Sequence, residues 1–382
     1  MIDLLAWLLL WLPALAALVL LTELTAAQFA AKPLPMAGSP RTAIVVPAHD
    51  EADAIGATVA ALLSAAAHAR LLVVADNCGD ATAALAHAAG AEVIERCDPA
   101  LRGKGFALGF ARDHLATEPP EIVVVVDADC SMDGAGLSRL AATAHAIGRP
   151  VQSTYVLRAR PDLGAMVGLS GFAFLLRNLV RQRGLARLGA PALLTGSGMA
   201  FPWPAFEAAP LATDALAEDL HIGIELARQG RPPAYLPDVT TWSGPARRAA
   251  TTIQRSRWEQ GFLRTALAAA WPLLRSGRAP LVWLGLHCLV PPLALLVAAE
   301  TLALIVLGGL IRLGATRLPL ALLSLLVGLQ LLMLLLSWAR FGRAQISGLR
   351  LLLIPFYIAW KLPLYAAAAL RPERRWIRTD RN

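Results

Sequence analysis

The sequence predicts an α/β domain on a mostly parallel sheet, with transmembrane helices at the N-terminal and C-terminal ends. Short β-branched runs alternate with helix-like Ala/Leu segments over residues 41–157, as in sheets covered on both faces. The hydrophobic fraction is 57%, and the excess is concentrated in the first thirty residues and after Pro280. Acidic residues follow several of the apolar runs. Together these features predict a membrane-attached domain with a polar site at one sheet edge.

Composition narrows the class of ligand. The 382 residues carry a formal net charge of +8, and the basic residues cluster beside apolar segments. This arrangement favours anionic membrane lipids as partners over nucleic acid, which would need a basic face on a compact domain. The four cysteines form no CxxC pair, so neither a disulfide framework nor a zinc site is expected.

The N-terminal segment Leu4–Leu21 is apolar and uncharged, close to the length that crosses a bilayer. A cleaved signal peptide is the alternative, but Asp3 stands where such a peptide carries basic residues. We therefore expect residues 1–30 to be a retained anchor. Because Lys32 and Arg41 follow it, the positive-inside rule predicts a multi-pass protein of the inner (cytoplasmic) membrane whose domain at residues 40–262 is cytoplasmic.

The C-terminal region contains further apolar segments. Residues 263–280 are expected to form an interfacial helix and residues 281–370 the membrane segments, followed by a basic tail at 371–382. Leu281–Ile311 is interrupted by Pro291-Pro292, and Leu318–Trp338 is an uninterrupted span. Leu351–Leu370 precedes the basic tail, so we expect it to lie in the interface or to re-enter.

The elements of the central domain can be read in order from their apolar pattern. Strands are predicted at Thr42–Pro47, Leu71–Ala75, Ala91–Glu95 and Glu121–Val126, and helices at Glu51–Ala67, Ala81–Ala89 and Lys104–Leu115. The later stretch Gly164–Arg183 fits either an amphipathic helix on the membrane surface or an ordinary packed helix.

Polar residues stand at the ends of three of these strands. Each group alone fits helix capping or turn formation. Three groups on one sheet edge instead suggest a cation, because crowded carboxylates repel and hard divalent ions choose oxygen ligands. The candidate residues for binding such a cation and the ligand that it accompanies are Pro47, Asp50, Glu51, Asp76, Asp127 and Asp129.

These groups suit a nucleotide diphosphate-sugar. Mg²⁺ or Mn²⁺ held by Asp127 and Asp129 would neutralise the diphosphate and stabilise it as a leaving group. Lys104 opens a helix between glycines, where anions bind well, although the spacing does not match a P-loop.

Two later motifs complete the candidate site. Glu218 and Asp219 open a helical stretch, where they either complement the helix dipole or supply a general base. Gln254, Arg257 and Trp258 share one helical face that suits a diphosphate and a sugar ring; an interfacial anchor is the alternative.

The ordered set PAHDE, VVADNCGDAT, RGKGFAL, VVVVDAD, GSGMAF, AED and QRSRW resembles family 2 glycosyltransferases with a GT-A fold. The resemblance covers about Thr42 to Gly261. It is nearest to the branch with cellulose, chitin and hyaluronan synthases and bacterial exopolysaccharide enzymes.

The resemblance implies a role for each matching residue. Asp76 would contact the uracil base, Lys104 the nucleotide, and Asp127 and Asp129 the metal and phosphates. Asp219 would be the catalytic base of an inverting hexosyltransferase. Gln254, Arg257, Trp258 and Glu218 would bind the diphosphate and the acceptor sugar.

The sequence departs from the family pattern at Asp50, where Asn is usual, and at Ala217, where Thr commonly precedes the acidic pair. Three spans are fewer than processive synthases use, which favours transfer of one or a few sugars in exopolysaccharide assembly. The expected acceptor is lipid-linked or a polysaccharide, and a partner subunit in the membrane would be needed for export. A glycolipid synthase resembling ceramide or hopanoid glucosyltransferases is the alternative, and a non-catalytic membrane scaffold is disfavoured because the acidic motifs are intact.

Overall fold

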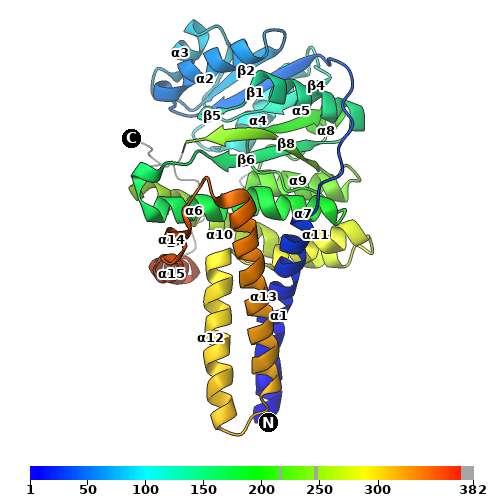
Figure 1. The fold of residues 1–382 in the computed structure, drawn as a ribbon. Coiled ribbons are helices and arrows are strands. Elements are labelled where there is room, and N and C mark those ends of the chain that lie inside the picture. The colour runs from blue at the N-terminus through cyan, green and yellow to red at the C-terminus, as the bar shows by residue number, and fades with distance from the viewer. Residues whose placement is uncertain (214, 216, 245–247, 371–382) are drawn as a thin grey trace.

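The computed structural model describes residues 1–213, 215, 217–244 and 248–370; the side chains at 161, 248–258, 364 and 366–370 are outside the description. Figure 1 shows two parts, a head that contains the sheet and a stalk of three long helices that extends away from it. The N-terminus lies at the far end of the stalk.

The head is built on an eight-stranded sheet in the order β3-β2-β1-β4-β7-β6-β8-β5. The first four strands are parallel, β7 runs antiparallel between β4 and β6, and β8 is parallel to β6. The mostly parallel α/β fold is therefore confirmed, with a mixed half. The strands are β1 (Thr42–Ala48), β2 (Arg70–Asp76), β3 (Glu92–Arg96), β4 (Ile122–Val125), β5 (Cys130–Ser131), β6 (Val151–Leu157), β7 (Met199–Pro202) and β8 (Ala234–Ser243).

The continuous apolar runs of β1, β2 and β4 are explained by a core on each face of the sheet. Along β1, Ile44 and Val46 point into one core while Ala43 and Val45 point into the other. Helices α2 (Ala52–Ala65), α3 (Thr82–Ala88) and α5 (Gly134–Ile147) cover the first face. Helices α4 (Lys104–Leu115), α8 (Trp203–Glu207) and α9 (Glu218–Arg228) cover the second.

A layer of helices separates the sheet from the stalk (Figure 1). Residues 165–187 form α6 (Ala165–Leu175), the π-helical turn η2 (Leu176–Arg181) and α7 (Gln182–Arg187), entered through the short η1 (Pro161–Leu163). Phe172, Leu175 and Val180 are buried in a core shared with the stalk. The segment Gly164–Arg183 is thus largely a packed helix.

The same layer contains α10 (Arg248–Leu274) and α11 (Ala279–Leu289), which pack on α9 and α7. The interfacial helix expected at 263–280 is therefore the last part of the longer helix α10. The chain turns at residues 275–278, and α11 begins after this turn. Pro291-Pro292 separates α11 from α12 (Leu293–Arg312), so the long apolar stretch after residue 280 contributes one span that starts at Leu293.

The described residues include three helices long and apolar enough to cross a membrane: α1 (Ile2–Ala27), α12, and α13 (Leu318–Ser337) continued by η3 (Trp338–Gly342). Helix α1 fits closely against the head, because a Cβ at Gly184 of α7 would lie 2.3 Å from the Glu23 carbonyl oxygen. The anchor is thus packed onto the domain.

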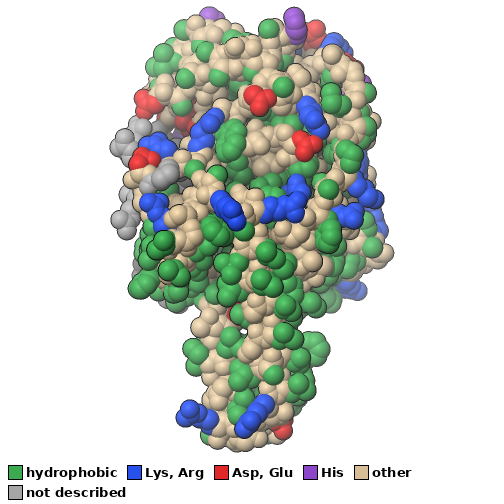
Figure 2. Space-filling view, viewed as in Figure 1, with side chains coloured by type: hydrophobic (Ala, Val, Ile, Leu, Met, Phe, Trp, Pro, Cys, Tyr) green, Lys and Arg blue, Asp and Glu red, His purple; other side chains and the backbone are tan. Residues whose placement is uncertain are grey.

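The surface changes character along the molecule. In Figure 2 the stalk is largely hydrophobic, Lys and Arg side chains gather at the base of the head, and charged side chains reappear at the stalk tip. At that tip the Thr316 amide donates to Asp3 at 2.7 Å, between Arg312 and Arg317. The short α14 (Gly348–Leu351) leads into α15 (Ile354–Leu370), which lies across the stalk direction below α6 (Figure 1). The basic tail at 371–382 lies outside the described residues.

Candidate active site

The Asp127-Ala128-Asp129 motif follows β4 at the carboxyl edge of the parallel strands. The Asp127 backbone amide donates to Ser197 Oγ at 3.0 Å, and Asp129 accepts from Ser243 Oγ at 3.1 Å. Ligand atoms of Asp127, Asp129 and Cys130 lie within 4.8 Å of one another. Burial, and then the Asp127 charge, raises the pKa of the Cys130 thiol to about 12. A neutral thiol is a poor ligand for a hard cation, so the two carboxylates are the groups suited to Mg²⁺ or Mn²⁺.

Lys104 at the start of α4 brings a positive charge to this edge. Its Nζ forms an ion pair with Asp127 and donates to the Gly196 carbonyl at 2.6 Å. Burial opposes its charge, but Asp127 and Glu218 outweigh burial and raise the pKa of Lys104. The first turn of α4 approaches its neighbour closely, since a Cβ at Gly105 would lie 2.4 Å from the Leu211 carbonyl oxygen. Lys104 is therefore a fixed cation of the site.

Gly196 is the point on which three charged groups converge. A Cβ at Gly196 would lie 3.5 Å from Asp219 Oδ2, 3.5 Å from Lys104 Nζ and 3.9 Å from Asp127 Oδ2. Its φ of +93° also favours glycine. Asp219, more than ninety residues after Asp127 in the chain, is thus brought to the same site by the start of α9.

Burial makes both carboxyl groups of the acidic pair at the start of α9 weaker acids than usual. It raises the pKa of Asp219, an effect that Arg177 partly offsets. It also raises the pKa of Glu218 to about 7, with a further contribution from the neighbouring Asp219 charge. A carboxylate whose pKa approaches neutrality is suited to accept a proton at physiological pH.

The loops after β1 and β2 form a second group on the same edge. The Asp76 carboxylate is buried and paired with Arg96 at 2.7 Å. The backbone of Asp50 has a φ of +52°, and its carboxylate accepts from the Gly79 amide at 2.6 Å. Because β2, β1 and β4 are adjacent and parallel, these loops lie along the edge that carries Asp127.

Pro47 and Glu51 occupy structural positions in this part of the site. Pro47 lies within β1, in register with Val74 of β2. The Glu51 amide donates to Thr82 Oγ1 at 2.8 Å, which joins the starts of α2 and α3. Both residues therefore help to shape the β1 and β2 loops.

Gln254, Arg257 and Trp258 lie in α10, which is helical as the spacing predicts. Their side chains lie outside the described residues. Glu259, the next residue, accepts hydrogen bonds from Lys361 and from the Tyr365 hydroxyl in α15. Helix α10, which carries these three residues, is thus in contact with α15.

Three contributors were missed from the sequence. Ser197 binds the backbone of Asp127, and Ser243, the last residue of β8, binds the carboxylate of Asp129. A single serine gives no sequence signal for such a role. Arg177 of η2 lies over the Phe262 ring at 4.6 Å, and burial lowers its pKa while Asp219 raises it. An arginine within the apolar run LLRNLV was the one available signal.

The sequence and the fold are both similar to those of known proteins. The sequence profile described as "Glycosyltransferase like family 2" matches residues 40–261. A mannosyltransferase from Pyrobaculum calidifontis, solved with GDP-Man and Mn²⁺, is 20% identical with a TM-score of 0.60, over 94% of this chain and 98% of that one.

A second solved structure is more distant. Mannosyl-3-phosphoglycerate synthase from Rubrobacter xylanophilus is 18% identical with a TM-score of 0.44, over 63% of this chain and 76% of that one. Among curated proteins, none matches the sequence.

Proposed function

The chain belongs to the glycosyltransferase-like family 2, and from this premise we propose that it transfers a hexose from a UDP- or GDP-sugar to a membrane-associated acceptor. The observation that carries the proposal is the convergence of Asp127, Lys104 and Asp219 on Gly196, beside Asp129. The Pyrobaculum calidifontis enzyme, which was solved with GDP-Man and Mn²⁺, supports it by sharing the fold along nearly the whole chain.

The residues of the site fit a direct displacement. Asp127 and Asp129 would hold Mg²⁺ or Mn²⁺, which when bound neutralises the donor diphosphate. Lys104 adds a fixed positive charge. An acceptor oxygen forms the new bond to the anomeric carbon as the bond to the diphosphate oxygen breaks. Asp219 takes the proton from the acceptor hydroxyl, and the configuration at the anomeric carbon inverts.

Glu218, Gln254, Arg257 and Trp258 are proposed to bind the diphosphate and the acceptor, and Asp76 and the β1 loop residues Pro47, Asp50 and Glu51 the nucleotide. The head is assigned to the cytoplasm of the inner membrane, where nucleotide sugars are available and where the basic residues at its base belong. Three spans suit single or short transfer in exopolysaccharide assembly, with a membrane partner for export. An apolar cavity at the top of the stalk favours a glycolipid as the alternative product.

The test is donor binding and turnover by the purified full-length protein with a panel of UDP- and GDP-hexoses. We expect one donor to bind in calorimetry only with Mn²⁺ or Mg²⁺ present. Asp129→Ala should weaken that binding about 100-fold or more, since even partners of metal ligands contribute 10–100-fold. Asp238→Ala is the matched control, because Asp238 is exposed on β8 and pairs with Arg139. Equal binding by the two variants, or binding unaffected by EDTA, would contradict the proposal.

The product separates the two acceptor classes. Incubation of labelled donor with membranes should give a chloroform-soluble product for a glycolipid or lipid-linked sugar, and a large aqueous product for a polymer. Absence of labelled product with every donor would refute transfer.

A further inference from the structure

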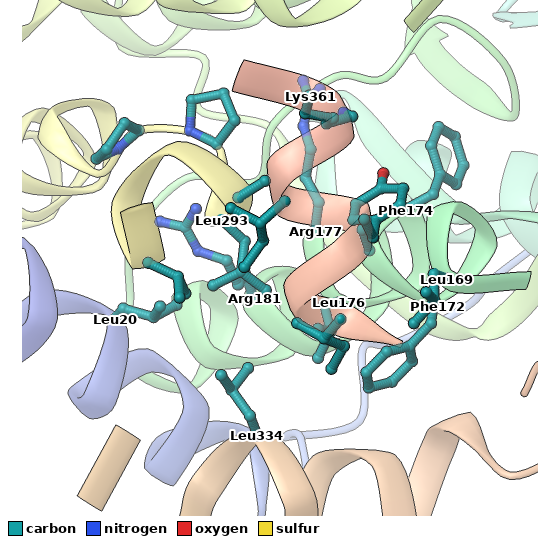
Figure 3. A pocket seen from close by; sticks show the side chains of 18 of the residues that line it. Leu20, Leu169, Phe172, Phe174, Leu176, Arg177, Arg181, Leu293, Leu334 and Lys361 are labelled. Carbon is teal, nitrogen blue, oxygen red and sulfur yellow. The ribbon is translucent and has the colours of Figure 1, made fainter. Parts of the chain in front are cut away.

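An apolar cavity lies where the head meets the stalk. Its volume is about 240 Å³, and its walls come from α1, α6, η2, α12, α13 and α15. Figure 3 shows Leu20, Phe172, Leu293 and Leu334 around it. An apolar cavity of this volume is suited to a hydrocarbon chain segment and not to water.

Four charged side chains line this cavity: Arg177, Arg181, Glu259 and Lys361. Arg177 and Lys361 lie at the end away from Leu334 (Figure 3). Lys361 is neutralised by Glu259, and Arg181 is bound to Glu23 at 2.6 Å. The buried Nε of Arg177, in contrast, has no hydrogen-bond partner among the described side chains. The charges of Asp219 and Glu259 act on Arg177, but its Nε–H has no acceptor in the part of the chain that the structure describes. A buried N–H without an acceptor at the end of an apolar cavity favours an oxygen-rich group such as a phosphate.

The charged end is adjacent to the candidate base. Phe262 lines the cavity beneath the Arg177 guanidinium, at 4.6 Å. Phe262 also packs in the same core cluster as Ala217 and Leu220, the residues on either side of Glu218 and Asp219. A group bound at Arg177 would therefore lie near the acidic pair of α9, whose Asp219 charge acts on Arg177.

We propose that this cavity binds one hydrocarbon chain of the lipid acceptor, with the phosphate of that lipid at Arg177. The inference rests on the proposed sugar transfer only for the identification of this lipid as the acceptor. Guanidinium geometry matches phosphate oxygens, and the apolar walls continue into the stalk helices that would lie in the bilayer. The arrangement holds the acceptor by its tail and its charge while its head reaches the site.

The test is equilibrium binding of labelled farnesyl phosphate to the purified full-length protein in detergent. Ala173 lines the cavity one helical turn before Arg177, so Ala173→Phe should fill it. Ala299→Phe adds the same side chain at an exposed position of α12 and is the matched control. Val297→Phe fills the cavity from the opposite wall and replaces Ala173→Phe if that variant does not fold.

We expect the wild type and Ala299→Phe to bind the probe saturably, and the cavity-filling variant to bind at least about tenfold more weakly. Arg177→Met should remove the preference for farnesyl phosphate over farnesol, because the preference comes from the charge. Two-chain phosphatidylglycerol should compete about tenfold less well.

Equal binding by the cavity-filling variant and Ala299→Phe would overturn the proposal. Equal competition by phosphatidylglycerol would also overturn it, because it would indicate a structural lipid. Neither result depends on donor binding, so failure here is distinct from failure of the proposed function.

Discussion

Two clusters of charged side chains, one buried and one half-buried, differ in how their charges are balanced. The junction cluster, Glu23, Arg181 and His287, lies where α1 meets η2 and α11. Glu23 accepts from Arg181 at 2.6 Å and lies 2.8 Å from His287 Nδ1. Burial and the Arg181 charge lower the pKa of His287, which keeps the imidazole neutral. The negative charge of Glu23 and the positive charge of Arg181 thus cancel within the cluster.

The site cluster, Lys104, Asp127, Glu218 and Asp219, is not balanced in this way. Among these described side chains three carboxylates face one ammonium, and Arg177 offsets the charge of Asp219 from outside the cluster. Carboxylates crowded in this way raise one another's pKa values or attract a cation. The balanced junction cluster therefore packs the anchor against the domain, whereas the excess negative charge of the site cluster suits a cation. Substitutions should therefore change stability at the first and chemistry at the second.

The largest effect is expected at the site cluster. Asp219→Asn removes the proton acceptor, so kcat should fall about 10²- to 10⁴-fold, the usual contribution of a general base. The dissociation constant of the donor should stay within about threefold, because the amide keeps the shape of the carboxyl group. Initial rates and calorimetry measure the two quantities.

Asp238→Asn, on the exposed surface of β8, serves as the control for removal of a carboxylate and should keep the wild-type rate. Unchanged turnover in Asp219→Asn would remove the distinction between the two clusters.

The next effect is expected at the junction cluster. Glu23→Ala leaves Arg181 buried without its partner, and loss of one member of a buried pair costs about 3–5 kcal/mol in the free energy of unfolding. The double variant Glu23→Ala/Arg181→Met should recover part of that loss. Denaturant unfolding in detergent measures both, with Glu207→Ala on the exposed end of α8 as the control. A double variant no more stable than the single one would show that the pair does not act as a unit.

The two regions also differ in how far sequence could predict them. The helix Lys104–Leu115 has the bounds expected, and β1 and β4 follow their apolar runs, because local pattern decides elements buried on both faces. The insertion of β7 between β4 and β6 depends on pairing across the chain, which no local pattern reports. The acidic motifs were expected to share one site, but Gly196 as the point where Asp127 and Asp219 meet, and the position of Arg177, were not predicted.

The smallest effect concerns the acid–base balance of the site cluster. Burial raises the pKa of Glu218 from an ordinary value of 4.5 to about 7. Between pH 4.5 and about pH 7 the folded protein binds more protons at this group than the unfolded chain does. The free energy of unfolding therefore falls as the pH rises through this range, and the loss is complete above about pH 7. Glu218→Gln does not titrate, so its unfolding free energy relative to the wild type should increase by roughly 1–3 kcal/mol from pH 5 to pH 8. The measurement is denaturant unfolding in EDTA, since a bound cation would hold the carboxylates ionised. Glu207→Gln should show no such change with pH, and curves for Glu218→Gln that run parallel to the wild type would mean that the site cluster carries no excess negative charge.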